Sequence, residues 1–187
     1  MITRYVTNTY EIIDTYKEII LLSNDAKVKI EPSSDNKTKL VFDEKKRRPH
    51  EFSIKDGTLT IKPSKAKWYN FLGIGINRSE LLLNIPNSVL EKISVKANVG
   101  QVDIRSINCK KAIGVKINTG KVLLNDCFAP EICVKTNTGS VSGKLPLNTV
   151  FTARTNTGKI EIPKPPIGEI VCGRCDIKTN TGNIRFE

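Results

Sequence analysis

Apolar and polar positions recur in one fixed order in the second half of the chain. Each copy has an apolar residue five positions before a glycine and a second one two positions after it, with polar residues around them. This alternation predicts two short strands that turn their apolar side chains to the same side of a corner. The copies are VKANVGQVDI, VKINTGKVLL, VKTNTGSVSG, ARTNTGKIEI and IKTNTGNIRF, beginning at Val95, Val115, Val134, Ala153 and Ile177.

The glycines of these copies set the length of the repeat. They stand 20, 19, 19 and 24 residues apart, at Gly100, Gly120, Gly139, Gly158 and Gly182. A short and steady period indicates one structural unit, here called a rung, stacked on copies of itself. Glycine suits a corner with positive φ, and the asparagine two positions earlier can bond to the bend.

Two arrangements fit this repeat. Rungs stacked in parallel would form a β-solenoid with ladders of equivalent side chains, whereas hairpins turning at Asn-Thr-Gly would form a meander. The phrase recurs in the same direction at nearly constant length, which favours the solenoid.

The first part of the chain has a different pattern. Its β-rich segments are short and end at Pro, Gly, Asn or Asp, as strands do. We expect an all-β protein that forms one body, with an irregular strand-rich part at residues 1–90. That part would pack on, or run into, a single-stranded parallel β-solenoid of five NTG rungs at residues 91–187.

Composition adds little to the fold but limits the location. The hydrophobic fraction is 39%, no apolar stretch is long enough for a membrane-spanning helix, and the start MITRYVTNTYEI does not resemble a signal peptide. We therefore expect a cytoplasmic protein or the soluble part of a surface-anchored one.

The net charge of +11 lies mainly on the repeats, with +4 on residues 1–90 and +7 on residues 91–187. This excess favours anionic partners, but no motif specific for nucleic acid is present.

The most specific candidate for a binding site is a row of basic residues, one standing four positions before each glycine, which predicts an anion-binding ladder. The alternative is a solvated face whose long side chains cover apolar edges and oppose edge pairing. The candidate ladder consists of Lys96, Lys116, Lys135, Arg154 and Lys178.

A second candidate site is the aromatic segment around Trp68, Tyr69 and Phe71, which has basic neighbours. Exposed, it would grip sugar rings or a membrane interface. Packed inward, it would cover the end of the core, as repeat stacks require.

No constellation for catalysis, cofactor binding or metal binding emerges. The five cysteines have no regular spacing, and the pair Cys172 and Cys175 lacks a second ligand pair, which leaves only a hypothesis of an oxidisable pair. His50 is the only histidine and lies in a charged segment where we expect an exposed turn. The sequence therefore predicts no enzyme and no cofactor.

Residues 21–187 resemble the bacterial "putative adhesin" repeat family of single-stranded β-solenoids, which is related to toast-rack domains. The resemblance rests on the segments DGTLTI and LLLNIP and on the tandem NTG phrases. It implies a β-solenoid and an adhesion role, and it carries no catalytic motif.

Two functions follow from the sequence. The first is a non-catalytic adhesion or binding scaffold that presents its basic laddered face to an anionic polymer or a cell-surface component. The second is a structural or assembly module, because the last copy ends at Glu187 directly after the strand NIRF. An uncapped C-terminal rung there could pair with a second copy as a homodimer.

Overall fold

The computed structural model describes all residues except 1–4, 46–49, 65–78, 87–89, 165–167 and 169. Every regular element in the described part is a β-strand, which confirms the all-β class. The strands are β1 (Tyr5–Ile12), β2 (Glu18–Pro32), β3 (Thr38–Lys45), β4 (His50–Lys55), β5 (Thr58–Pro63), β6 (Glu80–Ile85), β7 (Leu90–Arg105), β8 (Cys109–Asn125), β9 (Glu131–Thr138), β10 (Val141–Lys144), β11 (Thr149–Thr157), β12 (Ile160–Glu161), β13 (Gly173–Thr181) and β14 (Ile184–Phe186).

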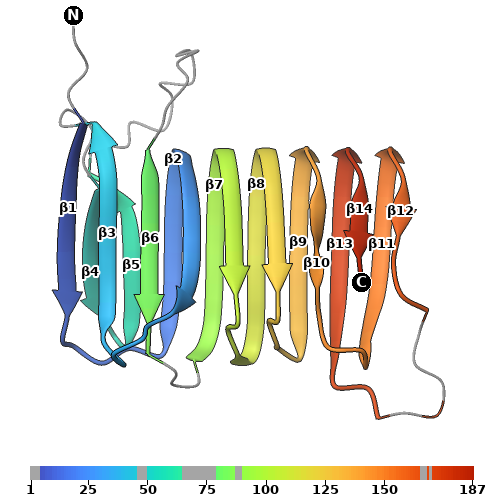
Figure 1. Ribbon diagram of the computed structural model, residues 1–187, viewed down its shortest axis with the longest axis horizontal. Helices are drawn as coiled ribbons and strands as arrows, with labels where there is room; N and C mark the ends of the chain where they lie inside the picture. The colour runs from blue at the N-terminus through green and yellow to red at the C-terminus, as the bar shows by residue number, and fades with distance from the viewer. Residues whose placement is uncertain (1–4, 46–49, 65–78, 87–89, 165–167, 169) are drawn as a thin grey trace, which may run out of the picture.

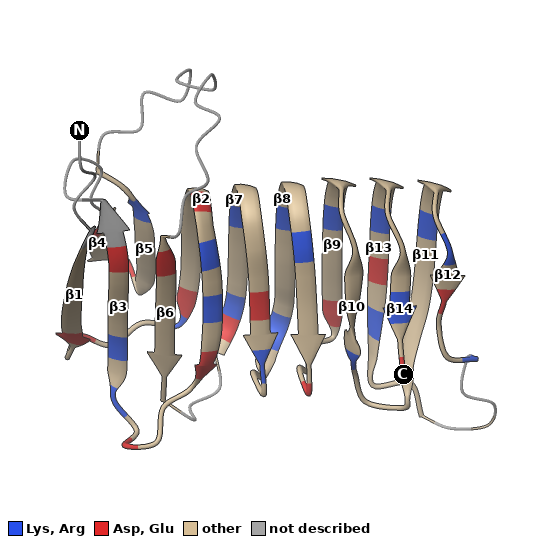
Figure 2. Ribbon diagram, turned by 45° about the horizontal axis from the view of Figure 1, so that its top comes forward, with Lys and Arg blue, Asp and Glu red and all other residues tan. Residues whose placement is uncertain are grey.

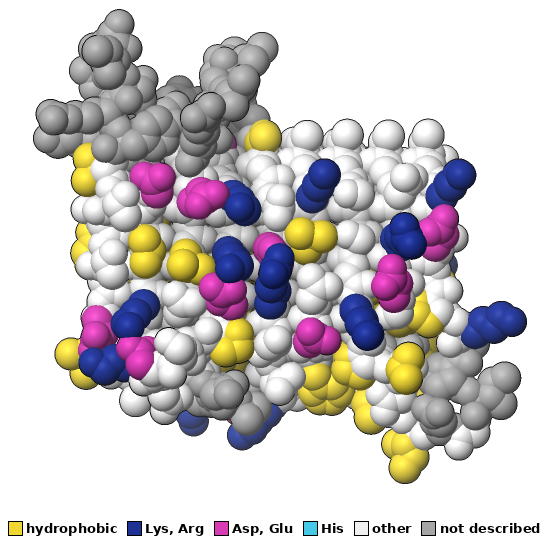
Figure 3. All heavy atoms as spheres, viewed as in Figure 1, with side chains coloured by type: hydrophobic (Ala, Val, Ile, Leu, Met, Phe, Trp, Pro, Cys, Tyr) yellow, Lys and Arg dark blue, Asp and Glu magenta, His cyan; other side chains and the backbone are white. Residues whose placement is uncertain are grey.

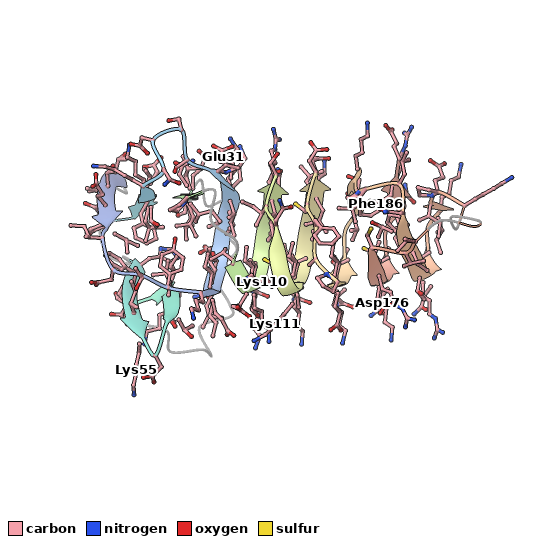
Figure 4. The ribbon with its side chains drawn as sticks, turned by 90° about the horizontal axis from the view of Figure 1, so that it is seen from below. Glu31, Lys55, Lys110, Lys111, Asp176 and Phe186 are labelled. Atoms are coloured by element: carbon pink, nitrogen blue, oxygen red, sulfur yellow. The ribbon has the colours of Figure 1, made fainter. Side chains whose placement is uncertain are left out.

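The strands form two facing layers (Figure 1). In each copy of the phrase the chain passes from one layer to the other at the glycine corner. β7 and β8 bend through the corner, whereas in later copies the corner separates β9 from β10, β11 from β12, and β13 from β14. One layer precedes the corner along the chain and contains β4, β5, β9, β13 and β11 with the first halves of β2, β7 and β8. The other layer follows the corner and contains β1, β3, β6, β10, β14 and β12 with the second halves of β2, β7 and β8. Alternate side chains fill the space between the layers, where Phe186 lies (Figure 4).

Neighbouring copies of the phrase pair in parallel and in register. Gly100 lies opposite Gly120, and Val115 lies between Val95 and Val134. Hairpins would pair antiparallel, so this pairing excludes the meander. The inward valines are at most 3% exposed, which makes the column they form a continuous part of the core.

β2 is a copy of the rung that the repeat pattern does not identify. It pairs in parallel with β7, placing Leu21 opposite Val95, Ala26 opposite Gly100 and Val28 opposite Val102. Ala26 replaces the glycine and, unlike the corner glycines, has no positive φ. Parallel stacking therefore begins within residues 1–90, and the solenoid continues from that part without a break.

Beyond β2 the stack ends in antiparallel strands, with β3 between β1 and β6 and with β4 beside β5. Aromatic rings meet here: Tyr10 contacts Phe42 and Phe52 edge-on, with ring centroids 6.0 and 5.2 Å apart. His50 stacks on Phe42 at 5.2 Å. The expectation of an exposed turn at His50 is therefore wrong, because this residue begins β4 and is half-buried under an aromatic contact.

The last copy along the chain is not the last in the stack. β13 lies between β9 and β11, and β14 lies between β10 and β12. The prediction of an uncapped C-terminal rung is therefore wrong, and among the described strands β11/β12 forms the open edge instead.

A steric difference explains this order. A Cβ added to Gly173 would lie 2.5 Å from the carbonyl oxygen of Ala129, so β13 can approach β9 only with glycine at this position. The residue of β11 at the same register position is Thr149. β11 therefore cannot take the place beside β9 without a shift of the backbone.

The corner glycines allow very close contacts between the backbones of neighbouring rungs. Gly139 has a φ of 144°, and a Cβ there would lie 1.6 Å from the carbonyl oxygen of Gly120. No side chain can be accommodated at that separation, so the spacing of neighbouring rungs at the corner requires glycine.

Replacing Gly139 by valine should therefore lower the free energy of unfolding by roughly 3 kcal/mol or more, because overlap adds to backbone strain. Gly114→Val is the matched control, since Gly114 has no positive φ and its nearest neighbouring atom would be 3.8 Å from an added Cβ. Chemical denaturation of both variants measures the difference. Equal stability of the two variants would contradict the corner assignment.

Candidate functional site

The structure brings all five residues of the predicted ladder together on one face. Lys96 lies opposite Lys116, Lys116 opposite Lys135, Lys135 opposite Lys178, and Lys178 opposite Arg154. All five side chains are exposed. They form the row of basic positions near the upper ends of β7, β8, β9, β13 and β11 (Figure 2).

The ladder has a definite length. On β2 the residue opposite Lys96 is Leu22, which carries no charge. The basic row therefore begins at β7. It ends at Arg154 on the open edge. Paired strands lie about 4.8 Å apart, so the four steps of the ladder span about 19 Å.

None of the five ladder cations has an ion-pair or hydrogen-bond partner in the described part of the chain. Neighbouring unit charges at this separation repel by somewhat under about 1 kcal/mol in water, and salt screens them further. The backbone pairing of the strands tolerates this repulsion. An anionic ligand lying along the row would relieve it.

The two layers differ in charge. We define the ladder face as the outward positions of β7, β8, β9, β13 and β11 between the level of Lys92 and the corner. It carries two carboxylates, Glu131 and Asp176, against seven cations. The seven cations are Lys92, Lys96, Lys116, Lys135, Arg154, Arg174 and Lys178.

Charges of both signs are interspersed on the opposite layer, which faces the viewer in Figure 3. Several of them are paired there. The Arg105 guanidinium lies 2.8 Å from Asp103, and Arg185 lies 3.6 Å from both Glu161 and Glu187. The ladder face therefore differs from this layer in both the balance and the pairing of its charges.

The asparagines of the phrase join neighbouring corners. The side-chain amide of Asn118 donates to Oδ1 of Asn98 at 3.2 Å, and Asn180 donates in the same way to Asn137. These bonds run along the stack, so they explain the asparagine column as a structural feature of the corners.

The open edge exposes side chains that every other rung buries. Ile160 is 42% exposed, whereas Ile184, Val141 and Val122, which precede it in the same column, are 0% exposed. Phe151 and Ala153 on β11 are only half-buried. Sequence reasoning missed this surface because it placed the last copy, and not β11/β12, at the end of the stack.

The other sequence-predicted candidates do not join a site. Trp68, Tyr69 and Phe71 lie outside the described residues. Across the described part of the chain, no group of three His, Cys, Asp or Glu side chains is arranged to hold a metal ion.

The cysteines are mostly structural. Burial raises the pKa of the Cys109 and Cys175 thiols to about 12 and that of Cys127 to about 11. Cys172 is exposed, while Cys175 points into the core. The two residues of CGRC thus have opposite environments, and of these two only Cys172 is open to reagents in solution.

In the folded protein, iodoacetamide should modify Cys172 while Cys109, Cys127 and Cys175 stay unmodified, because buried protonated thiols are poor nucleophiles. Mass spectrometry of peptides after brief alkylation measures this, and alkylation in guanidinium supplies the fully modified control. Modification of Cys175 at the rate of Cys172 would show that the inward position is wrong.

Comparison with known proteins supports the fold. The structure is similar to that of a protein from Clostridium sporogenes described as a "putative cell adhesion protein", with 16% identity, a TM-score of 0.71, and coverage of 98% of this chain and 99% of that one. A "putative adhesin" from Bacteroides fragilis has 15% identity and a TM-score of 0.47, over 98% of this chain and 97% of that one. Another from Parabacteroides distasonis has 14% identity and a TM-score of 0.38, over 99% and 98%. The last two scores are too low to carry an argument.

No curated protein matches the chain. Within the described ranges, no helix has the length and apolar character needed to cross a membrane. The model of the Toastrack DUF4097 family matches residues 16–187, a range that includes β2 and all later strands. By this match over nearly its whole length, the chain belongs to the Toastrack DUF4097 family.

Proposed function

We propose that this protein is a non-catalytic adhesion or binding scaffold whose ladder face binds a linear anionic polymer. The observation that carries the proposal is the register of the five ladder cations, which are exposed, adjacent and without ion-pair partners in the described chain. A rigid row of charges selects for an extended polyanion, because several anionic groups along one chain can contact it at once.

The parallel backbone pairing supports this role. Each ladder residue lies within a strand that is paired on both sides, except Arg154 on the edge strand β11. The Cα positions are therefore fixed before a ligand binds, and only the flexible ends of the side chains must be ordered. The protein of similar fold from Clostridium sporogenes, described as a putative cell adhesion protein, agrees with a binding role.

The proposal predicts binding that depends steeply on salt. If five cations each displace a counterion, affinity for inorganic polyphosphate should fall about a hundredfold between 50 and 200 mM salt, as expected for a flexible single-stranded polyanion. The triple variant Lys116→Glu, Lys135→Glu, Lys178→Glu reverses the centre of the ladder and should abolish detectable binding. Fluorescence anisotropy with labelled polyphosphate measures both effects.

A matched control separates the ladder from net charge. The variant Lys121→Glu, Lys144→Glu, Lys159→Glu makes the same change in charge with exposed lysines of the opposite layer. It should keep most of the affinity. Equal loss in both variants would mean that only the overall charge attracts the polymer, and binding by the ladder variant at the wild-type level would refute the proposal.

A second candidate function is assembly through the open edge of β11/β12. The specific observation is the exposure of Ile160, which rises to 42% from 0% in the preceding rung of the same column. β11 and β12 also leave one side of their backbones unpaired among the described strands, and such edges readily pair with another chain. A second copy would offer the same two strands at the same separation.

End pairing predicts a dimer whose fraction rises with protein concentration. Ile160→Lys should make the protein monomeric, because an inward charge on an edge strand opposes pairing. Ser142→Lys is the control, since it adds the same charge to β10, two strands from the edge in the same layer. Sedimentation equilibrium measures the masses, and a wild type that stays monomeric at the highest concentration would exclude this function.

A further inference from the structure

The β13/β14 rung occupies a slot whose two walls precede it in the chain. One wall is β9/β10 and the other is β11/β12, and the inserted rung pairs in parallel with both. Residues 145–148 connect β10 to β11 across the width of the slot, about 10 Å for two strand spacings. The slot is therefore a binding site for one rung, built by residues 129–161.

Steric fit, in addition to backbone hydrogen bonding between strands, determines which rung the slot accepts. Gly173 is required at the position next to Ala129, where an added Cβ would lie 2.5 Å from the carbonyl oxygen. Inside the slot, Cys175, Ile177 and Ile184 are at most 1% exposed, and the ring of Phe186 lies 5.1 Å from that of Phe151. The glycine and the inward apolar residues of this strand pair thus match the space that the slot offers.

The far wall depends on the inserted rung. Among the described strands, β11 pairs only with β13, and β12 pairs only with β14. Gly158 packs at its corner against Gly182, and the hydroxyl of Thr155 donates to the carbonyl oxygen of Gly182 at 3.1 Å. The inserted rung thus joins the last rung of the stack to the rest of the solenoid.

The connection to the inserted rung is long. Eleven residues separate Glu161 from Gly173, and three of them are prolines, Pro163, Pro165 and Pro166. Fully extended, eleven residues reach about 38 Å, several times the width of the slot. The covalent connection therefore does not require the slot and its occupant to belong to the same molecule.

We propose that the slot of one copy accepts the β13/β14 rung of a second copy, so that two molecules become joined by rung exchange. All backbone and side-chain contacts of the inserted rung are the same in both arrangements, so the balance depends on concentration and on the connection alone. This inference is independent of what the ladder face binds. It also differs from end pairing, because the exchanged rung lies inside the stack.

Cross-linking inside the slot tests the proposal with the full chain. Ser142 of β10 lies opposite Arg185 of β14, and both side chains point outward. Cysteines at these positions in separate chains are held within disulfide distance only if β14 of one copy enters the slot of the other, whereas random encounters give the background yield that the control measures. The background carries Cys172→Ser and Cys133→Ser, which remove the exposed and the half-buried thiol. Ile160 is kept because it lies in β12, a wall of the slot. End pairing does not interfere, since it would hold Ser142 and Arg185 of different chains about four strand spacings, or about 19 Å, apart.

Equal amounts of the Ser142→Cys and Arg185→Cys chains are unfolded together, refolded at increasing concentration and mildly oxidised. We expect a disulfide-linked heterodimer whose yield rises with concentration and exceeds that of the control by roughly tenfold, because exchange holds the thiols at high effective concentration. The control mixes Ser142→Cys with Lys27→Cys, a position in the same layer on β2, three strands from β10. Non-reducing electrophoresis and mass spectrometry measure the yield.

Two outcomes would overturn the proposal. One is a heterodimer yield no greater than that of the control at every concentration, including after unfolding. The other concerns a single chain carrying both Ser142→Cys and Arg185→Cys, which should form an internal disulfide when dilute. Failure to form it would mean that β14 does not lie beside β10, and rung exchange would have no slot to enter.

Discussion

The structure depends on how closely the backbone passes itself at the corners. An added Cβ on Gly120, Gly139 or Gly182 would lie 1.7, 1.6 or 1.9 Å from the carbonyl oxygen of the glycine in the preceding rung. These contacts stack the corners directly on one another, and the register of the whole phrase follows. Once the corners are aligned, every residue at a given offset must fall into one column. The valine column, the asparagine column and the basic ladder are thus consequences of one steric condition.

This condition also separates stability from surface chemistry. The columns that point inward bury aliphatic side chains, while the outward positions contribute little to the core and are free to vary. A row of like charges is therefore tolerated on the ladder face, where its repulsion is small against the backbone pairing and core burial beneath it. The mixed and partly paired charges of the opposite layer indicate that the basic row is not a general property of the surface.

Much of the stack could be predicted from local sequence, because glycine, asparagine and alternating apolar residues act within a few positions of each other. The parallel register and the adjacency of the basic residues followed from that pattern. β2 escaped recognition because Ala26 replaces the glycine, although Asn24, Leu21 and Val28 keep their offsets. The spatial order of the last two rungs had no local signal. Both contain the same phrase, and the contact of Gly173 with Ala129 that distinguishes them joins residues distant in sequence.

The inserted rung has a consequence for synthesis on the ribosome. β11/β12 leaves the ribosome before the strands of its only described partner, since about 25 residues separate Glu161 from Phe186, roughly 1 to 5 s at ordinary rates of translation. During that interval the apolar residues of β11/β12 lack the β13/β14 rung on which they pack in the folded protein. The stack cannot be completed until β13/β14 has been synthesised. Before then, a chaperone or a neighbouring nascent chain can contact the exposed β11/β12 segment.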